Sequence, residues 1–369
     1  MIEEIENKLE IISKVYSHYI LNYKECRKST RFQKDRPAYS FSETMSYLGD
    51  TLGIISQTPK IEDFSSAFAY HISLLQAIYV QQDLVLELLY LVNCDLDKGD
   101  LKKDSNYTIN RDIRNELVGH PIRKVVEKIE NSEKKKTVLL SSVLMDIHSN
   151  SKVLAYARYH KDNNYEFEKL TFKISDIIER HYSFLNNYLD IIISKFKSIL
   201  ADFSERVSNI IGLIDKKPFE LILKLVKLHF ESIFESRYCY DEDSLVQIYA
   251  RKEENERFLF FIETFIKELK DQLEETVREI PFEFKKRIWA NIEQTENIPI
   301  SLTHHYELGK LATKRNKMDF DFFSGLLRLK CENDDLVQLE IDNMENNIYK
   351  PIEYYSSLNL IRRKLLKIN

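Results

Sequence analysis

The stretch TPKIEDFSSAFAYHISLLQAIYVQQDLVLELLYLV, residues 58–92, decides how the N-terminal half of this chain folds. Thr58 followed by Pro59 predicts a helix start there, because proline is favoured at the first helical position. The following apolar residues recur at helical spacing, which is typical of a helix that buries one face. We therefore predict one long helix that ends near Val92, with an apolar pattern that runs through Phe64, His71, Leu75, Ile78, Leu84 and Leu88.

Helical patterns continue on both sides of this segment. Residues 2–27 carry a stripe of large side chains every three or four positions, at Ile5, Leu9, Ile12, Tyr16, Tyr19 and Tyr23. A further helix is predicted over 42–56. Asp176 and Glu179 form a capping pair, which predicts a long helix from there to about Phe203. Prolines then separate the later helices, which we expect over 219–234, 253–279 and 351–368.

Residues 138–172 change to a pattern that is typical of strands. Apolar runs at 138–144 and 153–159 flank the polar turn Ser149-Asn150-Ser151, which predicts a β-hairpin. A second turn at 161–164 leads to alternating apolar and polar residues over 165–172. The expected fold class is mainly α. It comprises an N-terminal helical bundle over 1–132, a β-hairpin followed by a long helix over 133–203, and a C-terminal helical domain over 204–369.

Composition agrees with a helical protein of more than one domain. A chain of 369 residues exceeds the size at which one hydrophobic core usually stops growing. Only 7 glycines occur, and 43% of the residues are hydrophobic, which favours helices over turn-rich sheets. The sequence has no GxxxxGK[ST], GxGxxG or GxSxG motif, so a P-loop, a Rossmann nucleotide site and a hydrolase elbow are not expected.

Neither a metal nor any other cofactor is expected. The four cysteines form no CxxC pair, which argues against a zinc site; they are Cys26, Cys94, Cys239 and Cys331. His304, His305 and Glu307 resemble a metal cluster, but neighbouring residues of a helix point about 100° apart. No run of 18 uncharged apolar residues occurs, so we expect a soluble cytoplasmic protein and no membrane segment.

The segment Arg114-Asn115-Glu116-Leu117-Val118-Gly119-His120 has a pattern that is typical of catalysis. Cleaving RNA without a metal requires groups that transfer protons and a cation for the phosphate. A histidine titrates near neutrality, and an arginine can bind two phosphate oxygens. Arg114 and His120 are therefore candidate catalytic residues.

This arrangement of an arginine, a polar residue and a histidine resembles the signature of the HEPN ribonucleases. The resemblance covers about the first third of the chain. It implies an all-helical domain that cleaves RNA without metal, with Arg114, Asn115 and His120 as its catalytic residues. Such domains are common in prokaryotic toxin–antitoxin and antiviral defence systems. The resemblance therefore also implies a homodimer and a regulatory partner such as an antitoxin.

The motif helix should begin near Thr108 or Asn110 and end at Gly119, with a new helix starting at Pro121. An unbroken helix would place Arg114 and His120 about 120° apart around its axis. Either the break turns His120 toward Arg114, or the same residues of a second subunit complete the site.

Positive charge gathers around the motif although the whole chain carries a net charge of −5. Between Leu101 and Lys136 there are ten lysines and arginines and only six acids. Such a segment can attract a phosphate backbone, although exposed helix faces give similar runs. The candidate RNA-binding residues are Arg111, Arg123, Lys124 and Lys128.

A structural role for the motif is the alternative. An arginine in this position can pair with a nearby acid such as Asp112 or Glu116, and a histidine before a proline can cap a helix. The chain would then be a helical interaction protein without catalysis, in which Arg114 and His120 hold a junction between two helices.

Overall fold

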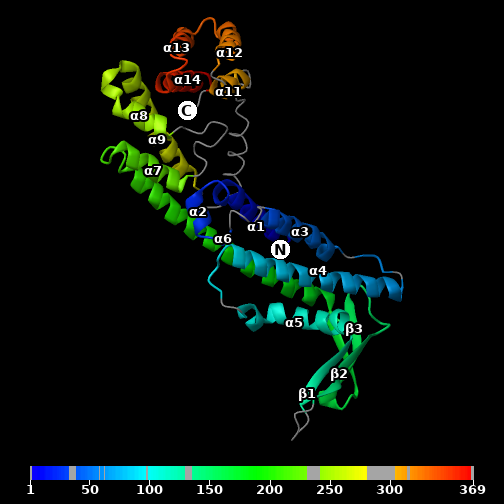
Figure 1. Ribbon diagram of the computed structural model, residues 1–369. Coiled ribbons are helices and arrows are strands. Elements are labelled where there is room, and N and C mark those ends of the chain that lie inside the picture. Colours follow the sequence, from blue (N-terminus) through cyan, green and yellow to red (C-terminus); the bar gives the residue numbers. More distant parts are fainter. Residues whose placement is uncertain are drawn as a thin grey trace. The chain divides into compact units, whose positions relative to one another are not determined.

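A computed structural model describes residues 2–32, 39–57, 59–61, 63–96, 99–128, 135–230, 242–280, 304–313 and 316–366 of the chain. Its contacts divide the protein into two compact units, Met1–Leu21 with Cys26–Ile199 and Asn22–Glu25 with Leu200–Asn369. The described residues are mainly helical, with one four-stranded antiparallel sheet (Figure 1). This confirms the predicted fold class at that level. The division between the units falls inside one long helix, α6.

The helices of the first unit follow the predicted pattern with shifted ends. They are α1 (Ile2–Val15), a π-helical turn (Tyr16–Ile20), α3 (Tyr39–Ser56), α4 (Phe64–Leu91) and α5 (Ser105–Arg114), while α2 (Lys24–Lys28) and α6 (Ile174–Ile211) cross between the units. The predicted helix start at Pro59 is wrong. Helix α4 begins at Phe64 because the Asp63 carboxylate accepts the N–H of Ser66 at 2.7 Å and caps the helix. Thr58 lies outside the described residues.

The sheet contains one strand that the sequence pattern did not predict. Strands β2 (Lys135–Met145) and β3 (Val153–His160) form the predicted hairpin, and β4 (Phe167–Lys173) follows it. The helix expected from Pro121 is wrong, because residues 122–128 form strand β1 (Ile122–Lys128) and pair antiparallel with β2. Two features explain the difference. The Pro121 carbonyl accepts the N–H of Val143 at 2.9 Å, which joins β1 to β2, and Val125 and Val126 favour a strand.

Helix α6 begins directly at the end of β4. The N–H of Ile174 donates to the carbonyl of Lys152 at 2.9 Å, so sheet and helix are continuous there. The capping pair expected at Asp176 and Glu179 is therefore wrong, since Asp176 lies in the first turn of the helix. The helix also continues to Ile211, beyond the predicted end at Phe203.

A buried polar network joins three helices of the first unit. The Gln81 side chain of α4 donates to the Leu48 carbonyl at 3.0 Å and to the Thr51 hydroxyl at 2.9 Å, both in α3. Its own carbonyl oxygen lies 2.6 Å from Nε2 of His181 in α6. Because that oxygen can only accept, Nε2 of His181 carries the proton. Gln81 and His181 are buried, so this network fixes how α3, α4 and α6 pack.

The second unit is helical throughout its described part. Its helices are α7 (Phe219–His229), α8 (Glu242–Ala250), α9 (Glu256–Glu279), α11 (His305–Thr313), α12 (Lys317–Lys330), α13 (Asp335–Asn346) and α14 (Pro351–Leu366). The side chain of Asn255 caps α9, which therefore begins three residues after the predicted start. A core that includes Phe320, Leu327 and Met344 packs α11 to α14 together. Residues 231–234 and 367–368 of the predicted helices lie outside the described residues.

Candidate active site

The motif lies on a π-helical turn that ends α5. The Asp104 carboxylate caps the start of α5 by accepting the N–H of Asn106 at 2.8 Å. After Arg114 the chain widens into a π-helix over Asn115–Gly119, and the N–H of His120 donates to the Asn115 carbonyl at 2.8 Å. Single π-helical turns are frequent at functional sites. The turn places His120 at the start of the loop that leads into β1, with its side chain exposed.

The guanidinium of Arg114 points back to α4. Its Nε and Nη2 donate to the side-chain oxygen of Gln76 at 3.2 and 3.0 Å, and Nη1 donates to the Asn115 side chain at 3.2 Å. The guanidinium also lies over the ring of Tyr79, 4.0 Å from its centroid. Neither of the acids that the structural alternative named, Asp112 or Glu116, pairs with it. Arg114 therefore connects α4 to the motif turn.

Gly119 is required where Arg114 approaches the turn. A Cβ atom at this position would lie 2.8 Å from Nη1 of Arg114, which is closer than non-bonded atoms come. The guanidinium is held by Gln76 and Asn115 and cannot move without losing hydrogen bonds. The absence of a side chain at Gly119 lets Arg114 pack against the turn that carries His120.

We expect Gly119→Ala to lower the melting temperature by about 2–4 °C, the equivalent of about 1 kcal/mol in a unit of this size. In an Arg114→Ala background, Gly119→Ala should lower the melting temperature less, because the guanidinium that the added methyl group would contact is absent. Thermal melting of the parent, both single variants and the double variant measures this coupling. An equal cost of Gly119→Ala in both backgrounds would contradict the close contact.

An open pocket of about 680 Å³ lies between the motif turn and the sheet. The helical side contributes Asp112, Asn115, Glu116 and His120, together with Ile109 and Ile113. The sheet contributes Arg123 from β1, Tyr156 and Arg158 from β3, and Leu170 and Phe172 from β4. The predicted site residues Asn115, His120 and Arg123 thus line one cavity.

The other predicted site residues lie elsewhere. Arg114 is not among the residues that line the pocket. Arg111 pairs with Asp83 at 2.8 Å and lies over the Tyr79 ring at 4.0 Å, so its charge is compensated on α4. Lys124 follows Arg123 in β1 and faces the opposite side of the sheet. Lys128 ends β1, and its side chain lies outside the described residues.

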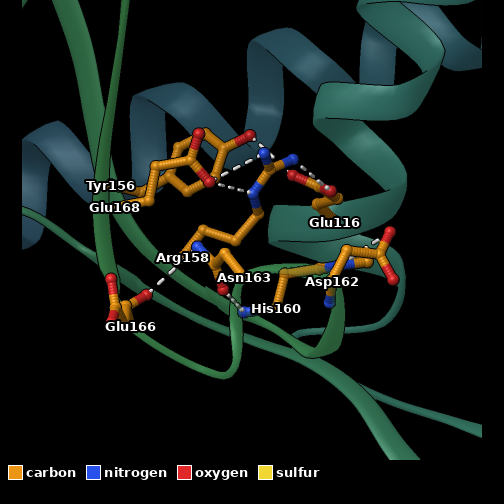
Figure 2. Close-up of polar contacts among 8 residues, drawn as sticks. All are labelled: Glu116, Tyr156, Arg158, His160, Asp162, Asn163, Glu166 and Glu168. Atoms are coloured by element: carbon orange, nitrogen blue, oxygen red, sulfur yellow. Dashed lines mark hydrogen bonds and ion pairs between the residues drawn. The ribbon is translucent and has the colours of Figure 1, made fainter.

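One side of the pocket is formed by a network of charged groups (Figure 2). Arg158 donates to Glu116 at 3.2 Å and to Glu168 at 2.8 and 3.0 Å, and the Tyr156 hydroxyl donates to Glu116 at 2.8 Å. Burial, followed by its hydrogen bond to Glu116, raises the pKa of Tyr156. Because two carboxylates compensate Arg158, this arginine holds the turn against the sheet and is not available to bind an anion.

Three charged or titratable groups of the pocket remain available to a ligand. Asp112 and His120 are exposed on the helical side, and Arg123 is exposed on β1. None of the three forms an ion pair within the described part of the chain. The pocket can therefore offer a carboxylate, an imidazole and a guanidinium to one bound group.

The sequence pattern did not identify Asp112, Tyr156 or Arg158 as site residues. A signal for Asp112 was present, since Asp112, Asn115 and Glu116 have the spacing that places residues on one side of a helix. Tyr156 and Arg158 are two apart on a strand and so share a face. Nothing in the sequence indicated that this face would meet α5.

No family model, no curated protein and no solved structure matches this chain. Within the described residues no group of three or more histidines, cysteines and acids could hold a metal ion. The Glu307 carboxylate, one member of the cluster considered above, binds Lys330 at 2.8 Å.

Helix α4 is long and apolar enough to cross a membrane by length and composition alone. Half of its most apolar window is buried inside the protein, which a core helix of a soluble protein also shows. The cytoplasmic location stays a prediction.

Proposed function

We propose that this chain is a metal-independent endoribonuclease of the HEPN type whose active centre is the pocket between α5 and the sheet. One observation carries the proposal: Asn115 and His120 of the motif line the same open cavity as Arg123. An imidazole and a guanidinium at one cavity are the groups that phosphodiester cleavage requires.

The reaction assigns one task to each available group. The 2′-oxygen of the ribose attacks the phosphorus, and the bond from phosphorus to the 5′-oxygen of the next nucleotide breaks. Asp112 accepts the proton of the 2′-hydroxyl, and the protonated His120 donates a proton to the leaving 5′-oxygen. Arg123 binds the phosphate oxygens, where negative charge builds up in the transition state. The products are a 2′,3′-cyclic phosphate and a 5′-hydroxyl.

Arg114 acts in this proposal as a positioning residue. Its hydrogen bonds to Gln76 and Asn115 fix the turn, and Asn115 in turn lines the cavity. The homodimer and the antitoxin-like partner that the resemblance implies remain part of the proposal. The division of tasks between Asp112 and His120 does not require a second subunit.

The products of cleavage test the proposal. The purified protein, incubated with single-stranded RNA in excess EDTA, should yield fragments that polynucleotide kinase labels at the 5′ end without prior phosphatase treatment. Treatment with acid should open their cyclic phosphates. Fragments with 5′-phosphates, or cleavage that EDTA abolishes, would contradict metal-free attack by the 2′-oxygen.

The non-catalytic alternative is favoured by one specific observation, the binding of Arg114 to Gln76 and Tyr79 outside the pocket. As an interaction protein, the chain would leave RNA intact. Arg114→Ala would then lower only the melting temperature, because the contact between α4 and the motif turn would be lost.

A further inference from the structure

The face of the sheet opposite the pocket is exposed and apolar. Side chains alternate between the two faces of a strand, so Arg123 faces the pocket and its neighbours Ile122 and Lys124 face away. The register shift beside them inserts an extra residue into β2 and leaves the alternation of β1 intact. Large apolar side chains stand open on this outer face, with exposed fractions of 65% for Ile122, 70% for Leu144 and 63% for Phe167.

A single row of paired residues crosses all four strands on this face. Ile122 pairs with Ser142, Ser142 with Tyr159, and Tyr159 with Phe167. The rings of Tyr159 and Phe167 meet edge to face, with centroids 6.1 Å apart and planes at 67°. With strands about 4.8 Å apart, the row spans roughly 14 Å. Two small residues, Ser142 within the row and Ala157 beside it, leave the aromatic rings accessible from above.

The charge on the outer face is positive. Lys124, Lys135 and Lys169 occupy outer positions of β1, β2 and β4 and are exposed. Asp146, the acid that borders the face, is bound by Lys169 at 2.7 Å. No acid pairs with Lys124 or Lys135 in the described ranges. The face therefore combines open aromatic rings with lysines that pair with none of the acids whose side chains the structure describes.

We propose that this outer face binds single-stranded RNA, with bases stacked on Phe167 and Tyr159 and the phosphate backbone on Lys124 and Lys135. The proposal rests on the proposed function, for which it supplies a substrate-binding surface. Sheets that bind single-stranded RNA stack two or three bases on exposed aromatic residues, and the row has the length for that number. A basic surface beside aromatic rings binds such strands with little sequence preference.

A second copy of the chain fits this face poorly. A twofold dimer brings the same patch of both protomers together. The face would then bring Lys124 and Lys135 of both protomers into one interface, and like charges that meet across an interface cost several kcal/mol. The charge complements an anionic polymer instead.

The test measures the binding of a fluorescent 12-nucleotide single-stranded RNA by anisotropy in EDTA, in a His120→Ala background that slows cleavage. Phe167→Ala should weaken binding at least about five-fold, because stacking on one aromatic residue contributes about 1–3 kcal/mol. Phe167→Leu should weaken it similarly, since leucine keeps the apolar volume and loses the ring. Phe322→Ala is the matched control, because Phe322 has an exposed fraction of 62% and a similar edge-to-face neighbour in Phe323.

Lysine variants add an independent readout. Lys124→Ala should reduce the slope of log affinity against log salt by about 0.7, which corresponds to the loss of one phosphate contact on a single strand. Circular dichroism melting of each variant shows whether the sheet remains folded, and Phe167→Tyr should restore binding because tyrosine also stacks.

Two results would overturn the proposal. Equal RNA affinity of the Phe167→Ala and Phe322→Ala proteins would exclude a stacking role for the outer face. Binding to phosphatidylserine vesicles that Phe167→Ala abolishes, with RNA affinity unchanged, would assign the face to a lipid surface. The two proposals fail separately. If the parent cleaves RNA and Phe167→Ala does not alter that cleavage, only the proposal for the outer face is wrong. If the parent binds RNA but does not cleave it, only the nuclease proposal is wrong.

Discussion

His120→Ala is expected to slow RNA cleavage by about 10²- to 10⁴-fold, the usual contribution of one group that transfers a proton. Asp112→Asn should cause a loss of similar size, since an amide cannot accept the proton of the 2′-hydroxyl. The double variant should be little slower than the slower single variant, because groups that act as a pair are not additive. Single-turnover rates with saturating protein measure the chemical step.

Matched controls separate catalysis from damage to the fold. His148→Ala removes an exposed histidine from the turn after β2, and Asp50→Asn neutralises an exposed acid of α3. Both should cleave at the parent rate. Full activity of the His120→Ala protein would end the ribonuclease proposal. Arg114→Ala, with unchanged cleavage and a lowered melting temperature, would favour the structural alternative for that residue.

The helices could be predicted because their patterns of apolar residues extend over many turns. Residues 64–91 carry many turns of one apolar stripe, and burial of that stripe determines the element whatever its neighbours are. The ends were less predictable, since a single hydrogen bond decides them. Asp63 caps α4 and moves its start away from Pro59, and the end of β4 supplies the start of α6 at Ile174.

The strand β1 could not be predicted from residues 121–128 alone. Pro121 suits the first turn of a helix, and the residues after it are mostly charged. Whether these residues form a helix or a strand depends on β2, which pairs with them over the whole length of β1. Long-range pairing of this kind leaves only a weak trace in the local sequence.

The end of the motif helix at Gly119 was predictable because glycine and proline follow each other closely there. The direction of each arginine was not, because it depends on partners far away in sequence. Gln76 and Tyr79 draw Arg114 to α4, and Asp83 does the same for Arg111. Arg123 lines the pocket because it lies on β1, the strand that the pattern did not predict.

Acid is expected to destabilise the first unit strongly between about pH 6.5 and pH 4. Burial lowers the pKa of His181 to about 3 and that of His71 to about 4, whereas an unfolded chain binds these protons near pH 6.5. In this window the unfolded state holds protons that the folded state lacks. The free energy of unfolding therefore falls as the pH falls, by about 1.4 kcal/mol per pH unit for each histidine.

The two histidines together should remove about 6 kcal/mol of stability by pH 4, a large share of the 5–15 kcal/mol that is usual for a folded domain. Urea unfolding at several pH values between 7 and 4 measures the slope. His181→Gln should roughly halve the histidine contribution, because glutamine can still donate to Gln81 but does not titrate. His148→Gln, at an exposed histidine, should leave the slope unchanged.

The difference in slope between the parent and His181→Gln is the informative quantity, since carboxylates such as Asp146, whose pKa is lowered by its hydrogen bond to Lys169, also lose stabilising interactions in acid. Their contribution is common to both proteins and cancels. If the two slopes agree, His181 must bind a proton in the folded state as readily as in the unfolded state. The network of Gln81, Thr51 and His181 would then open to water above pH 4, and could not be the contact that fixes α6 against α3 and α4.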